Sequence, residues 1–71
     1  MVRTHGTSIR AIRRAQGMGL RELSRRTGLD RGYLSRLERG LAGASDGTVR
    51  RVAAGLDVPQ EAITHEEKTT T

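Results

Sequence analysis

Arginine side chains are the groups in this sequence best suited to chemistry with a charged partner. Twelve of the 13 cationic residues are arginine, and the net charge is +5. In one short segment they recur at Arg31, Arg36 and Arg39, with Ser35 between them. A guanidinium group is a planar fork of N–H donors, so it can make two hydrogen bonds to one phosphate or to another planar acceptor. The composition therefore favours a polyanionic partner, with nucleic acid first and an anionic membrane second.

The sequence does not bring together the residue types that a catalytic or metal-binding site needs. His5 and His65 are its only histidines, they stand at opposite ends, and there is no cysteine. A metal site and a catalytic triad both need such groups close together, so we expect no metal, no cofactor, no small-molecule ligand and no enzyme. The absence of cysteine and of a long apolar run predicts a cytoplasmic protein without a signal peptide or membrane span. A nucleic-acid partner, which the charge favours, would add association with the nucleoid.

The elements that must position these arginines are short helices. The chain has 71 residues, one tyrosine, and no Phe or Trp, which suits one small core of aliphatic side chains. Apolar spacing and turn residues predict an all-α domain over residues 7–64, after a flexible arm (1–6) and before a disordered tail (65–71). Its five expected helices begin near Thr7 and cover residues 7–17, 20–27, 31–39, 46–56 and 59–64.

Local signals mark the ends of these helices. The expected N-caps are Thr7 or Ser8, Gly19, Asp30 and Ser45, while Pro59 should occupy the first position of the last helix. In the first helix the apolar residues Ile9 and Ile12 point inward, which leaves Arg10, Arg13 and Arg14 outside. Ile63 should close the core from the last helix.

The stretch TGLD joins the second and third helices with no room for a flexible linker. Gly28 can end one helix in the left-handed conformation, Leu29 can pin the turn, and Asp30 can cap the next helix. Counted from Leu20, the spacing fits a helix-turn-helix: Ser24 is small at position five, Gly28 stands at nine, and Leu23, Leu29, Leu34 and Leu37 are apolar at four, ten, fifteen and eighteen. Thr27 departs from it, because alanine or an apolar residue is commoner there.

The chain resembles the Xre-type, lambda-repressor-like family of bacterial and phage DNA-binding domains. The similarity extends from about Ile9 to Ile63 and includes YLSRLERG at residues 33–40, the family's commonest ending of the third helix. It implies a compact five-helix domain whose second and third helices form the helix-turn-helix. It also implies a sequence-specific regulator of transcription that binds double-stranded DNA, and we expect a repressor.

Two positions of the chain depart from the family's pattern, and one ion pair is implied by the resemblance. Leu20 stands where the family often has a glutamine that braces a phosphate, which puts part of the usual phosphate clamp in doubt. Ala44 precedes Ser45 where the family often has proline, which only loosens a loop. In the family an arginine of the first helix pairs with the glutamate near the end of the third, which implies an ion pair between Arg13 and Glu38. The alternative is two ordinary surface charges.

A helix-turn-helix places its second helix in the major groove, leading with the N-terminal half. We therefore expect the outer side of residues 31–39 to read bases, through Arg31, Gly32, Ser35 and Arg36. Each arginine can bond guanine O6 and N7, or can rest on a phosphate instead. Gly32 either permits close approach or reflects the tolerance of a first helical turn for glycine. The expected phosphate contacts are Arg21, Arg39, Thr48, Arg50 and Arg51.

One such motif makes only a short contact with DNA, so two copies on an inverted-repeat operator are expected. We expect no separate dimerisation domain, and we expect pairing on DNA or a weak homodimer through the regions of Leu41, Val58 and Ile63. The alternative function is a protein-docking adaptor or antitoxin-like partner for which DNA binding is secondary. Unchanged operator affinity after Arg36→Ala would favour that alternative.

Overall fold

Four α-helices and one short 3-10 helix form the fold in the computed structural model, which describes residues 4–64. They are α1 (Gly6–Ala15), α2 (Leu20–Thr27), α3 (Arg31–Glu38), α4 (Asp46–Leu56) and η1 (Gln60–Ile63). The expectation of five α-helices is wrong in its last member. Pro59 precedes η1 as its N-cap, and the four residues that follow make a single tight turn of 3-10 geometry.

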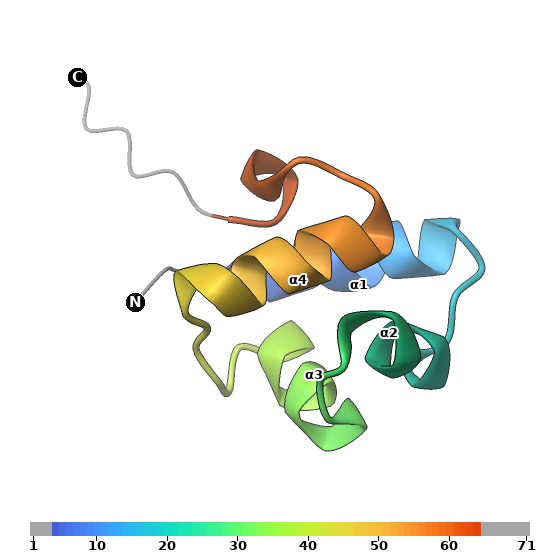
Figure 1. Ribbon diagram of the computed structural model, residues 1–71, viewed down its shortest axis with the longest axis horizontal. Helices are drawn as coiled ribbons and strands as arrows, with labels where there is room; N and C mark the ends of the chain where they lie inside the picture. Colours follow the sequence, from blue (N-terminus) through green and yellow to red (C-terminus); the bar gives the residue numbers. More distant parts are fainter. Residues whose placement is uncertain (1–3, 65–71) are drawn as a thin grey trace.

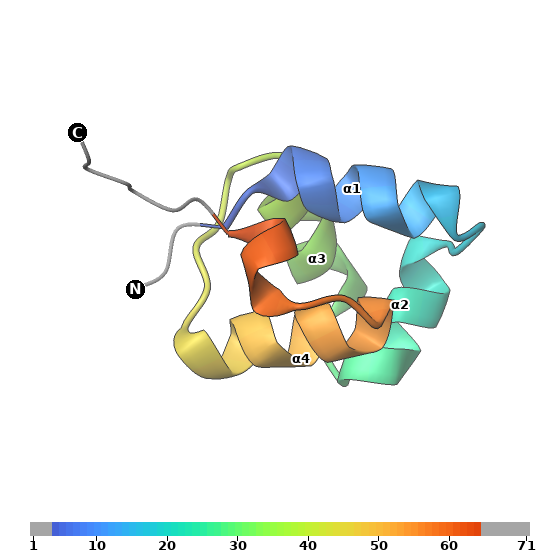
Figure 2. The ribbon, with the colours of Figure 1, turned by 90° about the horizontal axis from the view of Figure 1, so that it is seen from above.

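The helix-turn-helix lies on one side of α1 and α4, and η1 lies across the other side of both (Figures 1 and 2). α2 packs against α3 and α4, while α3 also packs against α1. This arrangement encloses one core whose largest fully buried side chains are Ile9, Leu23, Leu34, Leu37, Val49, Val52, Leu56 and Ile63. No helix within residues 4–64 has the length and apolar character needed to cross a bilayer.

Most of the predicted helix ends are confirmed. Asp30 accepts the Tyr33 N–H at 3.1 Å, and Ser45 accepts the Thr48 N–H at 3.2 Å, so both carboxylate and hydroxyl caps are made. The cap of α1 is not where it was expected. The helix begins at Gly6 with His5 as its N-cap, two residues before Thr7, and the His5 N–H is held by the carbonyl of Ile63 at 2.8 Å.

The expected flexible arm, residues 1–6, is therefore partly wrong. Thr4 pairs with Thr64 in an isolated antiparallel bridge, and Gly6 is buried as the first residue of α1. A Cβ on Gly6 would lie 2.5 Å from the carbonyl oxygen of Leu37 and closer still to that of Glu38. Only glycine allows this approach of α1 to the end of α3. Residues 1–3 and the predicted tail (65–71) lie outside the described residues.

The turn between α2 and α3 is held by its own backbone and by one side chain. Gly28 ends α2 with a φ of 77°, a left-handed conformation that costs glycine nothing. The hydroxyl of Ser24 donates to the Leu29 carbonyl at 2.5 Å, and Leu29 packs against the core. After α3, the Tyr33 hydroxyl donates to the Gly43 carbonyl at 2.6 Å, and Ala44 is buried. The predicted tight connection between α2 and α3 is confirmed. The loop after α3 is held at Gly43 by the Tyr33 hydroxyl and at Ala44 by burial.

Candidate nucleic-acid interface

The two sides of α3 differ sharply in what they contact. Leu34 and Leu37 are buried in the core, whereas Arg31, Gly32 and Arg36 are exposed to solvent. Ser35, the fourth residue expected to read bases, is half-buried at the edge of the same side. The structure therefore brings all four expected base-reading residues to one accessible face.

Helical spacing arranges this face as two parallel ridges. Arg31, Ser35 and Arg39 follow one another at intervals of four along one ridge, and Gly32 and Arg36 form the other. Arg39 Nε points back along its ridge and donates to the Ser35 carbonyl at 3.4 Å. Arg36 Nη1 likewise lies toward the leading end of α3, 3.6 Å from the point where a Cβ on Gly32 would be, as expected for side chains that lean toward a helix N-terminus.

The arginines of this face make no ion pair with another residue of the range 4–64. Among residues 4–64 the ion pairs involve only three arginines, namely Arg13, Arg25 and Arg26. Arg31 and Arg36 therefore have no carboxylate partner in this part of the chain. Uncompensated, exposed guanidinium groups on a helix are available to an anionic or base-edge acceptor from outside.

The ion pair expected between Arg13 and Glu38 is present and buried. Arg13 Nε lies 2.7 Å from Glu38 Oε2, Nη2 donates to Oε1 at 3.0 Å, and Nη1 donates to the Met18 carbonyl at 2.8 Å. The hydrogen bond to Glu38 raises the pKa of Arg13, partial burial opposes that rise, and the carboxylate charge adds to it. The expectation that Arg13 points outward is wrong, because this partner compensates its burial. The pair ties α1 to the last turn of α3.

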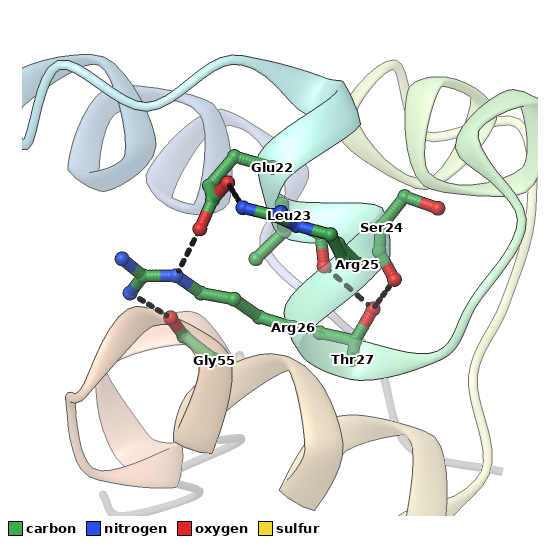
Figure 3. Close-up of polar contacts among 7 residues, drawn as sticks. All are labelled: Glu22, Leu23, Ser24, Arg25, Arg26, Thr27 and Gly55. Carbon is green, nitrogen blue, oxygen red and sulfur yellow. Dashed lines mark hydrogen bonds and ion pairs between the residues drawn. The ribbon is translucent and has the colours of Figure 1, made fainter.

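A second polar cluster fixes α2 to α4 (Figure 3). Glu22 accepts from Arg26 Nε at 2.9 Å and also pairs with Arg25, while Arg26 Nη1 donates to the Gly55 carbonyl at 3.2 Å. The hydrogen bonds from Arg26 and then Arg25 lower the pKa of Glu22. Arg26 therefore links the two helices, whereas the pair of Arg25 with Glu22 lies on the exposed surface of α2. The sequence reasoning did not assign these two arginines, although the spacing of Glu22 to Arg26 is a known helical pair.

Thr27, the one departure from the helix-turn-helix pattern, is buried beside this cluster. Its hydroxyl donates to the Leu23 carbonyl at 2.8 Å and accepts the Leu29 N–H at 3.2 Å. Its methyl group faces Gly55 of α4, where a Cβ would lie 2.8 Å from Thr27 Cγ2. The sequence reasoning missed Gly55, which provides the space for a branched side chain at this position.

The expected phosphate residues are spread over three elements. Arg21 is exposed in the first turn of α2, and Arg50 and Arg51 are exposed on α4. Of the expected residues on α4, Arg51 reaches the turn between α2 and α3, since its Nη1 lies 3.9 Å from where a Cβ on Gly28 would be. Arg50 points about 100° away from Arg51 around the helix. Thr48 is half-buried and its N–H is already bonded to Ser45, so the structure does not bring all these residues together.

Leu20 packs against the core in the first turn of α2, where it is half-buried. The position that often holds a glutamine in the resembling family thus serves packing in this chain. No group of three histidine, aspartate or glutamate side chains within residues 4–64 could hold a metal ion.

Comparison with known proteins decides the family. Residues 9–61 match the helix-turn-helix family HTH_3. The chain belongs to this family. Several solved structures share the fold of this HTH_3 domain. The restriction-modification controller protein C.AhdI from Aeromonas hydrophila is 31% identical, with a TM-score of 0.79, covering 82% of this chain and 88% of the other.

Two further structures extend this comparison. The clp gene regulator ClgR from Corynebacterium glutamicum is 34% identical, with a TM-score of 0.75, covering 79% of the HTH_3 chain and 73% of its own. SinR, the master regulator for biofilm formation solved in complex with DNA, is 35% identical, with a TM-score of 0.74 and coverage of 79% and 90%. A search of the curated proteins finds no match. Family and neighbours agree that this HTH_3 protein is a DNA-binding transcriptional regulator.

Proposed function

We propose that this regulator is a repressor that reads the major groove of double-stranded DNA with α3. The observation that carries the proposal is the outer side of α3, where Arg31 and Arg36 are exposed and have no carboxylate partner within residues 4–64. The inner side of the same helix is held by the core, by the Asp30 cap and by the pair between Arg13 and Glu38. A rigid helix with free guanidinium groups has the properties that base readout requires.

Base readout is assigned to the two ridges of α3. Arg31 and Arg36 each have the geometry to bond O6 and N7 of a guanine, and Ser35 can contact a base edge or a phosphate. Gly32 adds no hydrogen bond, and its place between these residues keeps the groove-facing surface low. The proposal gives the chain no catalytic role.

Phosphate contacts flank this surface in the proposal. Arg39 at the end of α3 and Arg51 beside the α2–α3 turn are best supported, because contacts tie each of them to the helix-turn-helix. Arg21, Thr48 and Arg50 complete the set at the first turn of α2 and on α4. Gly19, the N-cap of α2, has no side chain to bond the first turn, so the first N–H groups of α2 are available to a phosphate. Leu20 offers no polar atom there, which removes one side-chain bond from this clamp.

In the proposal, two copies of the protein bind an inverted-repeat operator together, in the nucleoid of the cytoplasm. Of the three side chains expected to support self-contact, Leu41 is 65% exposed, Val58 is half-buried and Ile63 is fully buried. Ile63 therefore cannot contribute surface. Such a small apolar contact favours pairing on DNA over a stable dimer, since specific interfaces bury far larger areas.

Binding-site selection followed by a matched pair of variants tests this proposal. Sites are selected from random duplexes, and fluorescence anisotropy compares wild type, Arg36→Ala and Arg10→Ala on a selected site and on random DNA. Arg10 is exposed on α1, so Arg10→Ala removes one positive charge, as Arg36→Ala does, from a place outside the reading surface. We expect Arg36→Ala to lose about 1–3 kcal/mol on the selected site and little on random DNA, and Arg10→Ala to bind like wild type.

Equal, small losses for both variants on both duplexes would contradict base readout by Arg36. Failure of the wild type to select any sequence would overturn the whole assignment. It would favour the alternative, in which the helix-turn-helix docks another protein and DNA contact is secondary.

A further inference from the structure

The guanidinium of Arg36 lies over the first turn of α3, in space left by Gly32. Arg36 Nη1 is 3.6 Å from the point where a Cβ on Gly32 would be, which is an ordinary van der Waals distance. Any atom beyond that Cβ on this ridge would compete with the guanidinium for the same place. Asp30 Oδ2 flanks the same point at 3.0 Å and is fixed there by its bond to the Tyr33 N–H.

We propose that Gly32 is a specificity-determining residue that acts through Arg36. Its missing side chain lets the arginine extend to the leading turn of α3, so that the guanidinium meets one guanine opposite that turn. The inference rests on the proposed function and deepens it, because it makes Gly32 and Arg36 one reading unit. Gly32 is a positioning residue in this unit, since Arg36 makes the base contact.

The geometry distinguishes this role from the simpler one, in which glycine lets the DNA approach the helix backbone. Alanine at position 32 leaves Arg36 in place, because its only tight contact is with the side chain of Asp30. Leucine at the same position fills the space of the guanidinium and displaces it. A backbone approach by DNA would instead be blocked by alanine and leucine alike.

Site selection from random duplexes with the full chain provides the test, using wild type, Gly32→Ala, Gly32→Leu and Arg36→Ala. We expect Gly32→Leu and Arg36→Ala to lose the preference for guanine at the same single position. Affinity for the wild-type site should fall roughly 5- to 150-fold in each. Gly32→Ala should keep the preference for guanine at that position, and its loss of affinity should be clearly smaller than that of Gly32→Leu, because its Cβ meets Asp30 and leaves the guanidinium of Arg36 in place.

A double-mutant cycle completes the experiment. With Arg36→Ala already present, adding Gly32→Leu should change affinity by less than about 2-fold, because the group it displaces is absent. Relaxation at a different position, or an equal further loss in the double variant, would overturn the proposal. An equal loss for Gly32→Ala and Gly32→Leu would overturn it too, in favour of backbone approach.

Stability and the parent function are monitored separately. Gly47→Leu introduces the same side chain at the second residue of α4, where a Cβ would meet only Ser45 Oγ at 3.9 Å. The thermal midpoint of Gly47→Leu shows how much a leucine in the first turn of a helix destabilises this domain. The midpoint of Gly32→Leu should lie within a few degrees of that value. If wild type selects no sequence, the proposed function fails. If it selects a site but Gly32→Leu reads that site unchanged, only this inference fails.

Discussion

Thr27 and Gly55 fit against each other where α2 crosses α4. A Cβ on Gly55 would lie 2.8 Å from Thr27 Cγ2 and 3.3 Å from Leu23 Cδ1, so a glycine at this position leaves the room that the threonine methyl occupies. The hydroxyl of the same threonine bonds the Leu23 carbonyl and the Leu29 N–H. One side chain thus sets the spacing of two helices and supports the turn that leads into α3.

Gly55→Ala is expected to destabilise the domain by about 1–2 kcal/mol, since overpacking outweighs the gain in helix propensity. Thr27→Ser removes the methyl and keeps the hydroxyl, so it should recover part of that loss in the double variant. Thr27→Val keeps a methyl against the glycine and should recover nothing. Urea unfolding of the three single variants and the two double variants measures the coupling, and additive effects of Gly55→Ala and Thr27→Ser would contradict the fit described above.

Gly6→Ala should destabilise the domain by at least about 2 kcal/mol, because the new methyl meets the carbonyl oxygens of Leu37 and Glu38, which are backbone atoms that cannot rotate away. Gly47→Ala is the matched control in an open first turn and should be neutral or mildly stabilising. Thermal unfolding compares the two. Equal midpoints would show that α1 can withdraw from the end of α3.

Glu38→Ala should cost about 3 kcal/mol, because it leaves the buried guanidinium of Arg13 without its carboxylate. Glu61→Ala removes an exposed acid from η1 and should change the free energy of unfolding little. Chemical denaturation gives both values. A small cost for Glu38→Ala would mean that water or another acceptor replaces the pair and that α1 and α3 are not locked by it.

The lowered pKa of Glu22 makes stability depend on pH on the acid side. Its pKa is below the ordinary value of 4.5 in the folded state, so the stabilisation is present above pH 4.5 and is lost as pH falls through the folded pKa. Glu22→Gln should flatten this part of the curve of thermal midpoint against pH and leave the neutral region nearly parallel. Curves that stay parallel below pH 4.5 would exclude Glu22 as a contributor.

Salt dependence reports how many phosphates the protein neutralises. With about six contacts, the logarithm of the association constant should fall against the logarithm of salt concentration with a slope near −5. Arg39→Ala should reduce the magnitude of that slope by about 1, and Arg10→Ala should not change it. Anisotropy titrations at several salt concentrations measure the slope. An unchanged slope for Arg39→Ala would remove that residue from the phosphate set.

Much of the fold could be predicted from the sequence because its signals are local. Asp30 and Ser45 cap helices through hydrogen bonds to backbone groups three residues away, so neighbouring residues suffice to identify them. Gly28 ends α2 for a similarly local reason, and the apolar spacing of Leu34 and Leu37 identifies the inner side of α3. The position of the candidate reading surface follows from the same periodicity.

Requirements that arise between distant elements cannot be read from the spacing within one element. Helical spacing placed Arg13 outside the core; its pairing with Glu38, 25 residues later, came from the family resemblance, and the tertiary structure showed that the pair makes burial of Arg13 favourable. In the sequence, Gly6 and Gly55 cannot be told from glycines of turns and helix ends. Glycine is needed at these positions because a Cβ would meet the carbonyl oxygens at the end of α3 or the methyl group of Thr27. Such requirements arise where two elements meet, and a pattern within one element contains no information about what will pack against it.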